Sequence, residues 1–363
     1  MKRPVALTHG LGLLLVMVAV GCHAKTIAGI EKLGGKVTVD ENSPGKPVIS
    51  VDFAGSKVTD AGLEHLEGLT RLQSLNLLQT EVTDAGLRHL KGLINLQSLN
   101  LMLTQVTGAG LEHLKGLPNL QKLDLSATKV TGAGLENLKG LTNLRDLHLA
   151  GTNVTNMGLE HLEGLVNLQS LDLPHDVTDE GLEHLKGLTR LQSLNLRGHI
   201  ADAGLVSLKW LINLGKLDLS CTKVTDAGLE HLKGLTNLRS LNLQATEVTD
   251  AGLRHLEDMT NLQSLDLQAT EVTATGLKHL RGLTDLRSLN LEDTQVTDAG
   301  LEHLGALTNL QSLNLNHTKV TDAELECLQG LTNLQWLDLR LTQVTDEAAK
   351  ELRQALPNCK IER

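Results

Sequence analysis

Histidines are the first residues in this sequence whose spacing suggests a chemical role. Nine of them recur at the same point of a repeated motif, and rows of imidazole groups are candidate metal ligands. Zinc requires its ligand nitrogens about 2.1 Å from the ion, whereas equivalent side chains on parallel helices about 8–10 Å apart do not converge. We therefore predict that these histidines pack against or hydrogen-bond to the neighbouring helix and hold no metal. They are His65, His89, His113, His161, His184, His231, His255, His279 and His303.

Aspartate and asparagine alternate along a second row, the middle column of residues that point outward from the expected strands. Neighbouring strands lie about 4.8 Å apart, which would allow a carboxylate pair or a shared metal. No two aspartates are adjacent in the row, and like charges directly opposite each other destabilise a sheet. The alternation favours a structural polar stripe, with a site for a cation or a basic ligand as the alternative. Its members are Asp52, Asn76, Asn100, Asp124, His148, Asp172, Asn195, Asp218, Asn242, Asp266, Asn290, Asn314 and Asp338.

A catalytic constellation is the next possibility. His148, with Asp124, Asp146 and Asp172 in the same or adjacent repeats, comes nearest to one, and we interpret it as a variant of the polar stripe. The sequence has no Gly-rich phosphate loop, nucleophile elbow or His-Glu-x-x-His helix. We therefore predict a non-enzymatic protein without catalytic residues or a cofactor.

The elements that position these rows come from one motif. Val-Thr-Asp-Ala-Gly-Leu begins at Val58 and returns with small variations, thirteen times in all, up to Val344. The step is 24 residues, apart from two steps of 23 that end at Val177 and Ile200. The chain has one Phe, two Trp and no Tyr, so leucine and valine must form its core. A small unit repeated at a fixed period predicts a solenoid whose units bury their apolar sides against one another.

Each repeat predicts a short helix followed by a short strand, as residues 224–243 show. Thr225-Asp226 offers side-chain oxygens that cap a helix N-terminus, and Leu229 and Leu232 share one helical face. Gly234 is expected to end the helix in a left-handed conformation. The Leu-x-x-Leu-x-Leu that follows alternates apolar and polar residues at the period of a strand.

The pattern Leu-x-x-Leu-x-Leu-x-x-Thr-x-Val resembles the leucine-rich repeat family from about Val48 to Ile361. The resemblance implies an α/β solenoid of about 13 repeats, with a curved parallel sheet on the inner face and helices on the outer face. This chain has Thr where the family usually has Asn or Cys, and a Thr hydroxyl can satisfy backbone groups where the chain leaves each strand. The Thr-Asp-x-Gly-Leu helix start also resembles bacterial exported repeat proteins and the repeat half of F-box substrate receptors, although no F-box-like segment precedes these repeats.

The two ends depart from the repeat and predict further segments. Residues 22–47 are expected to form a linker and an N-terminal cap, with a helix from Thr26 to Leu33 and an extended stretch from Lys36 to Val39. Residues 48–344 hold the repeats, and residues 345–363 are expected to cap the C-terminal end, because a bare end would expose the core.

Residues 1–21 predict a secretory signal of the lipoprotein type. Lys2 and Arg3 precede a short apolar stretch, which is the layout of a signal peptide. The stretch ends in Ala19-Val20-Gly21-Cys22, which resembles a bacterial lipobox and implies that Cys22 is lipidated. An ordinary cleaved signal is the alternative.

Charge and cysteine content limit the partners and the covalent links. The chain carries a formal charge of −10, and loss of residues 1–21 with their two positive charges gives −12. We predict no nucleic-acid partner, because phosphate contacts need a basic surface. The remaining cysteines are Cys221, Cys327 and Cys359. We predict no structural disulfide, with a Cys327–Cys359 pair as the one alternative.

The repeat pattern breaks between Pro174 and Lys216, and this zone predicts either a shaped site or drift at a repeat junction. Two steps lose a residue, and Trp210 stands where the helix-ending glycine should be. The last full strand adds Trp336 and Arg340, and Trp and Arg are enriched in binding hot spots. The candidate binding residues are Trp336, Asp338, Arg340, Arg197, His199, His175, Trp210, Lys216 and His148.

The sequence therefore predicts a binding module whose inner face recognises a protein or polysaccharide. The signal places it in the cell envelope, anchored in a membrane through Cys22, in the outer membrane or periplasm. A structural envelope spacer is the alternative. A substrate receptor of a ubiquitin-ligase-like assembly is a further one, based on resemblance alone.

Overall fold

The computed structural model describes residues 24–363. They form two compact units, the described part of residues 1–153 and residues 154–363, which we call unit 1 and unit 2. The expected signal segment, Cys22 and His23 lie outside the described residues. Within residues 24–363, no helix combines the length and the apolar character needed to cross a membrane.

Unit 1 starts with a helix over residues 24–32 and an antiparallel pair formed by β1 (Lys36–Val39) and β2 (Val48–Asp52). Strands β2 to β6 then pair in parallel, each with the next in the sequence. The remaining elements are η1 (Asp60–Leu66), β3 (Ser74–Asn76), α2 (Asp84–Leu87), η2 (Arg88–Leu90), β4 (Ser98–Asn100), η3 (Gly110–Gly116), β5 (Lys122–Asp124), η4 (Gly132–Leu138) and β6 (Asp146–His148).

Unit 2 continues the same alternation, and its strands β7 to β15 also pair in parallel in sequence order. Its first elements are η5 (Asn156–Leu162), β7 (Ser170–Asp172), η6 (Asp179–Leu185), β8 (Ser193–Asn195), α3 (Asp202–Leu205), η7 (Val206–Trp210), β9 (Lys216–Asp218), α4 (Asp226–Glu230), β10 (Ser240–Asn242), α5 (Asp250–Leu253) and η8 (Arg254–Leu256). Its last are β11 (Ser264–Asp266), η9 (Gly276–Leu280), β12 (Ser288–Asn290), η10 (Asp298–Gly300), α6 (Leu301–Leu304), β13 (Ser312–Asn314), η11 (Leu325–Leu328), β14 (Trp336–Asp338), α7 (Asp346–Ala355) and β15 (Lys360–Glu362).

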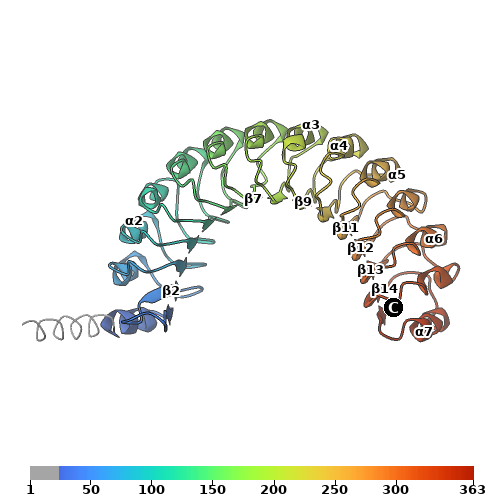
Figure 1. The fold of residues 1–363 in the computed structure, drawn as a ribbon, viewed down its shortest axis with the longest axis horizontal. Coiled ribbons are helices and arrows are strands. Elements are labelled where there is room, and N and C mark those ends of the chain that lie inside the picture. The colour runs from blue at the N-terminus through green and yellow to red at the C-terminus, as the bar shows by residue number, and fades with distance from the viewer. Residues whose placement is uncertain (1–23) are drawn as a thin grey trace, which may run out of the picture. The chain divides into compact units, whose positions relative to one another are not determined.

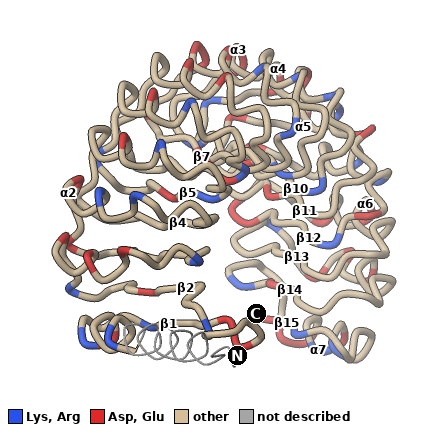
Figure 2. Tube along the Cα trace, turned by 60° about the vertical axis from the view of Figure 1, so that its left-hand side comes forward, with Lys and Arg blue, Asp and Glu red and all other residues tan. Residues whose placement is uncertain are grey.

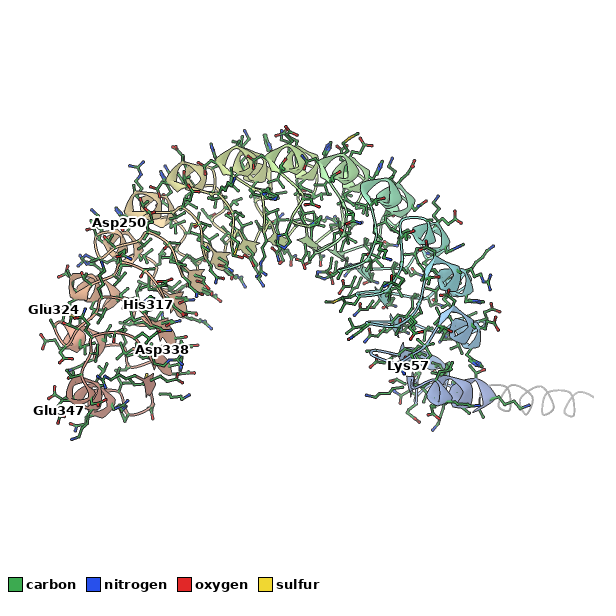
Figure 3. The ribbon with its side chains drawn as sticks, turned by 180° about the vertical axis from the view of Figure 1, so that it is seen from behind. Lys57, Asp250, His317, Glu324, Asp338 and Glu347 are labelled. Atoms are coloured by element: carbon green, nitrogen blue, oxygen red, sulfur yellow. The ribbon has the colours of Figure 1, made fainter. Side chains whose placement is uncertain are left out.

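In each unit the strands lie along one side and the helical turns along the other (Figure 1). The predicted α/β solenoid is therefore confirmed. We call the sheet surface that faces away from the helical turns the inner face. Figure 3 shows Asp338 on the strand side of unit 2 and Asp250, Glu324 and Glu347 on its helical side.

The core is a stack of leucines, as the repeat predicts. In the copy at residues 224–243, Leu229, Leu232 and Leu238 are fully buried and Leu241 is 1% exposed. Phe53 is the one aromatic side chain in the core of the described residues. Burial of a Leu side chain contributes about 1.5–3 kcal/mol, so the repeated leucine positions supply most of the driving force for folding.

The helical turns are shorter than the sequence suggests, and one expectation about how they end is wrong. Most are 3-10 turns of three to seven residues. Gly234 does not adopt a left-handed conformation; among the equivalent glycines of the described repeats, Gly68 and Gly92 do. The chain instead leaves the helix through consecutive tight turns, in which the N–H groups of Leu232, Leu235 and Leu238 each bond to the carbonyl three residues earlier.

Threonines fill the ladder position that the sequence assigns to them. Each Thr hydroxyl donates to the backbone carbonyl three residues earlier in the same repeat, and Thr222 does so to Leu219 at 2.6 Å. Nine of the ten are buried, so the bond removes the cost of an unpaired carbonyl where the strand ends. These threonines are Thr80, Thr104, Thr128, Thr152, Thr222, Thr246, Thr270, Thr294, Thr318 and Thr342.

The Thr-Asp pair at each helix start joins neighbouring repeats. Thr225 caps its own helix by accepting from the N–H of Ala227 at 3.2 Å, as predicted. Asp226 instead points to the next repeat, where its carboxylate accepts from the N–H and the hydroxyl of Thr249 at 2.8 and 2.7 Å. The same two bonds link Asp60 to Thr83, Asp84 to Thr107, Asp202 to Thr225, Asp250 to Thr273, Asp298 to Thr321 and Asp322 to Thr345.

Asparagines form a third set of links, at the edge of the sheet where the chain enters each strand. Asn237 donates from its side-chain amide to the carbonyl of Ile212 in the preceding repeat at 2.8 Å. Equivalent bonds are made by Asn95, Asn119, Asn143, Asn213, Asn261, Asn309 and Asn333. We call this side of the sheet the entry edge.

Candidate binding face

The polar stripe on the inner face has a structural role. Except at Asp172, which is followed two residues later by Pro174 and so by no N–H, the side-chain oxygen of each Asn or Asp accepts from the backbone N–H two residues later, as Asn242 does from Gln244 at 3.0 Å and Asp266 from Gln268 at 2.9 Å. This bond turns the chain out of the strand. No group of three or more His, Cys, Asp or Glu side chains in residues 24–363 is arranged to hold a metal ion. His148 lies in register with Asp124 on the adjacent strand of unit 1, whereas Asp172 belongs to unit 2.

Three members of the histidine row hydrogen-bond to the neighbouring helical turn, one of the two roles predicted for them. His89 Nδ1 lies 2.7 Å from Glu67 Oε1, and His184 Nδ1 lies 2.6 Å from Glu163 Oε1. His279 makes the same bond to Glu257. In all three cases the glutamate ends the helical turn of the preceding repeat, so the residue at that position decides whether the histidine has an acidic partner.

His255 shows the opposite case, because Lys233 occupies the glutamate position. Its Nδ1 is buried and has no hydrogen-bond partner among the described residues, and its Nε2 accepts from Arg254 Nε at 3.2 Å. Burial, followed by the charges of Lys233 and Arg254, lowers the pKa of His255, although Glu230 and Asp226 oppose this. His255 is therefore neutral at physiological pH.

This arrangement predicts a pH-dependent loss of stability. His255 has a folded-state pKa below its unfolded value of about 6.5, so the unfolded chain binds more protons and stability falls as the pH drops through that value. Lys233→Glu should supply the missing acceptor, raise the pKa of His255 and reduce this loss. NMR titration of the His255 imidazole together with thermal unfolding at pH about 8 and about 5 tests it, with the exposed Lys319→Glu as control. A pKa of His255 at or above its usual value would contradict the prediction.

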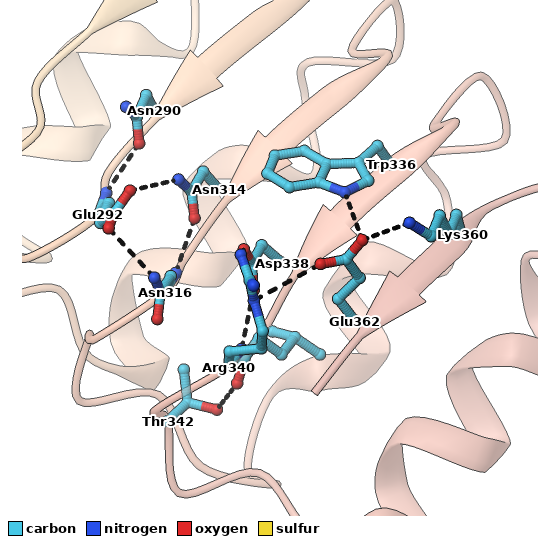
Figure 4. Close-up of polar contacts among 11 residues, drawn as sticks. Asn290, Glu292, Asn314, Asn316, Trp336, Asp338, Arg340, Thr342, Lys360 and Glu362 are labelled. Atoms are coloured by element: carbon cyan, nitrogen blue, oxygen red, sulfur yellow. Dashed lines mark hydrogen bonds and ion pairs between the residues drawn. The ribbon is translucent and has the colours of Figure 1, made fainter.

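Three of the candidate binding residues come together at the C-terminal end of the inner face (Figure 4). Arg340 Nε lies 2.9 and 3.0 Å from the two carboxylate oxygens of Asp338, and 3.5 Å from Glu362 Oε2. Trp336 donates from its indole N–H to Glu362 Oε1 at 3.4 Å, and Lys360 is paired with the same carboxylate. The structure thus holds Trp336, Asp338 and Arg340 in one polar network.

Burial and charge fix this network in one protonation state. The Asp338 side chain is 1% exposed, whereas that of Arg340 is 53% exposed. Burial alone would raise the pKa of Asp338, but the hydrogen bonds and the charge of Arg340 hold the pKa of this carboxyl below its ordinary value. The carboxylate therefore remains ionised at neutral pH and fixes a half-exposed guanidinium near a half-buried indole. An oriented Arg and Trp of this kind suits recognition of a protein surface.

A second polar cluster lies beside this network, and its members Glu292 and Asn316 were not among the residues predicted from the sequence (Figure 4). Glu292 accepts from the amides of Asn314 and Asn316 at 2.9 and 3.1 Å. The column two residues after the polar stripe carries the signal for them. It changes from Leu78, Met102, Ser126 and Ala150 in unit 1 to Gln244, Gln268, Glu292, Asn316 and Arg340 in unit 2.

The candidate binding residues of the irregular zone do not all come together. Trp210 ends the helical turn η7, is 52% exposed and lies under Lys209, whose Nζ is 5.1 Å from the ring centroid. Arg197 follows strand β8 and pairs with Asp218 at 3.1 Å. Lys216 begins β9 at the entry edge. The candidates in this zone are therefore spread over three parts of unit 2.

His175 and His199 lie in consecutive loops that follow strands β7 and β8. Gly198 has a φ of +121°, and a Cβ at this position would lie 2.7 Å from the carbonyl oxygen of His175. The missing residue in this repeat thus lets two backbones meet closely, which only glycine permits. The described cysteines Cys221, Cys327 and Cys359 all carry free thiols.

The alternating strands and helical turns, the stacked rows of buried leucines and threonines, and the parallel sheet of the inner face define a leucine-rich repeat solenoid. The family model described as "Leucine-rich repeat region" matches residues 128–361, and a second, "Leucine Rich repeat", matches residues 92–115 and 116–139. The chain therefore belongs to the leucine-rich repeat family.

Solved structures support the same fold. An internalin from Listeria monocytogenes is 24% identical, with a TM-score of 0.70 over 95% of this chain and 94% of that one. A leucine-rich repeat protein of Leptospira interrogans is 22% identical, with a TM-score of 0.63 over 83% and 80%. No curated protein matches the sequence significantly. At these identities the similarity shows the fold alone. The leucine-rich repeat fold indicates a protein-binding module.

Proposed function

We propose that this protein is an exported, lipid-anchored binding module of the cell envelope that recognises a protein partner through the inner face of its last repeats. The observation that carries the proposal is the Trp336–Asp338–Arg340 network, in which a buried carboxylate orients a half-exposed guanidinium near an indole. The four preceding repeats all have Ser at the Trp336 position, and they have Gln244, Gln268, Glu292 and Asn316 at the Arg340 position. Trp336 and Arg340 are therefore not needed to build a repeat.

A crosslinking pull-down from envelope extract tests the inner-face site. The bait is the chain from His23 onward, and the matched variant carries Trp336→Ser and Arg340→Gln, the residues that the repeats at β10 and β11 have at these positions. A control bait carries Glu347→Gln on the helical side. The proposal expects a protein captured by the wild type and the control but not by the double variant. Equal capture by all three baits, capture of polysaccharide alone, or no capture would overturn the proposal. The alternative, a structural envelope spacer, would then be favoured.

The anchor is tested separately. The proposal of lipidation rests on Ala19-Val20-Gly21-Cys22, where the thiol would carry the lipid and hold the repeats at the outer membrane or in the periplasm. Labelled fatty acid should be incorporated by the precursor and lost in Cys22→Ser. Incorporation that persists in Cys22→Ser would exclude this anchor without affecting the inner-face site.

A further inference from the structure

Three departures from the repeat pattern meet at one place on the entry edge of unit 2. Arg190 stands where most repeats have Asn, Gly215 stands where the others have Gln or Arg, and Lys216 stands where most have Ser. Together with Gln192 and Arg239, these residues line a groove of about 790 Å³. A volume of this size is typical of ligand sites.

The groove exists because Gly215 has no side chain. Every other repeat from β3 to β14 places a long polar side chain at this position, namely Gln73, Gln97, Gln121, Arg145, Gln169, Gln192, Arg239, Gln263, Arg287, Gln311 and Gln335. The backbone of Gly215 does not require glycine. Its φ is not positive, and an added Cβ would find its nearest neighbour, the carbonyl oxygen of Gln192, at an ordinary 3.6 Å. The residue therefore opens space without being needed for the turn.

The groove is positively charged in a chain whose net charge is −10. Arg190, Lys216 and Arg239 line it, and no acidic residue does. Lys122 occupies the position equivalent to Lys216 in unit 1 and is neutralised by Asp146, 2.9 Å away on the adjacent strand.

Lys216, by contrast, has only serines in register on the strands beside it, Ser193 and Ser240. Asp218, two residues further along β9, is already paired with Arg197. Figure 2 shows that Lys and Arg are otherwise interspersed with Asp and Glu along the chain. The positive charge of the groove is therefore a local feature.

We propose that this groove binds an acidic peptide segment. Arg190, Lys216 and Arg239 belong to three consecutive repeats, and strands repeat about every 4.8 Å, so their charges are spread along the groove and match a ligand that carries several negative charges in a row. In an extended chain every second side chain faces the same side, so an acidic peptide can present several carboxylates along the groove. Gln192 adds amide groups suited to a peptide backbone. Lys216 lies on β9 and Trp336 on β14, with strands β10 to β13 between them, so this site is independent of the one proposed above.

Fluorescence anisotropy with a labelled hexaglutamate peptide tests the inference, using variants that restore the repeat pattern. Gly215→Gln fills the groove without changing the charge, Lys216→Ser removes one charge, and Arg190→Asn removes another. Each should weaken binding about tenfold, while thermal unfolding stays unchanged. Lys319→Gln, which removes an exposed lysine elsewhere in unit 2, and Trp336→Ser should bind like the wild type.

Gly215→Gln is the decisive variant, because attraction by diffuse charge alone would be insensitive to it. The inference is overturned if the wild type does not bind hexaglutamate. It is also overturned if Gly215→Gln binds equally well, or if Lys319→Gln loses as much affinity as Lys216→Ser. Displacement of the peptide by inorganic phosphate, with the same dependence on the variants, would assign the groove to a small oxyanion and overturn the peptide ligand.

Discussion

Gly252→Ala is expected to lower the free energy of unfolding by about 2–3 kcal/mol, because overpacking a tight contact costs this much. Gly252 belongs to the Asp-Ala-Gly-Leu motif and is buried in helix α5. An added Cβ would lie less than 3.0 Å from Asp226 Oδ1 and 3.1 Å from a methyl carbon of Leu229. The carboxylate cannot retreat without losing its two bonds to Thr249.

The matched control is Gly234→Ala in the preceding repeat. An added Cβ at Gly234 meets nothing within 4 Å, and its φ is not positive. Removing a glycine from a compatible conformation is neutral or stabilises by about 0.4–1 kcal/mol. Urea unfolding followed by circular dichroism measures both variants. Equal midpoints for Gly252→Ala and the wild type would show that adjacent repeats do not approach as closely as the structure has them.

Asp226→Ala is expected to cost about 2 kcal/mol, because hydrogen bonds to charged groups contribute about 1.5–3 kcal/mol each and this carboxylate is only half-buried. Asp226→Asn should cost much less. The chain itself provides the precedent, since Asn156 accepts from the N–H of Thr178 at 2.8 Å and donates from its amide to the Thr178 hydroxyl at 2.7 Å. Asp258→Ala, at an exposed position, serves as the control. A loss for Asp226→Asn as large as for Asp226→Ala would mean that charge and not hydrogen bonding joins the repeats.

A double variant that carries both Gly252→Ala and Asp226→Ala tests whether the two losses of stability arise at the same contact. Asp226→Ala removes the oxygen that Gly252→Ala would strike, so the double variant should be more stable than the sum of the two single losses predicts. A coupling of this kind is expected only for residues in direct contact. Strictly additive losses would place the clash elsewhere, with Leu229 as the remaining neighbour.

The sequence by itself determined the repeat, the buried leucines and the alternation within each strand. The period of 24 residues and the positions of Leu229, Leu232 and Leu241 follow from residue order, because a small unit with one apolar side can bury it only against its neighbours. The ladder threonines were also predicted, since a hydroxyl near a strand end has a carbonyl within reach in its own repeat. The behaviour of Gly234 was not, because the same turn bonds form whether the glycine is left-handed, as at Gly68, or not, as at Gly234.

Only the tertiary structure decided which residues meet across repeats. Asp226 and Thr249 are 23 residues apart and His89 and Glu67 are 22 apart, so no local pattern links them, and stacking alone sets their contact. In the sequence, Arg197, Trp210 and Lys216 belong to one irregular zone. In the fold, Arg197 lies in the loop after β8, Trp210 at the end of a helical turn and Lys216 at the entry edge. The groove at Gly215 is the clearest case. A missing side chain becomes a cavity only when the long side chains of the repeats on either side stand around it, and that is a property of the packed chain.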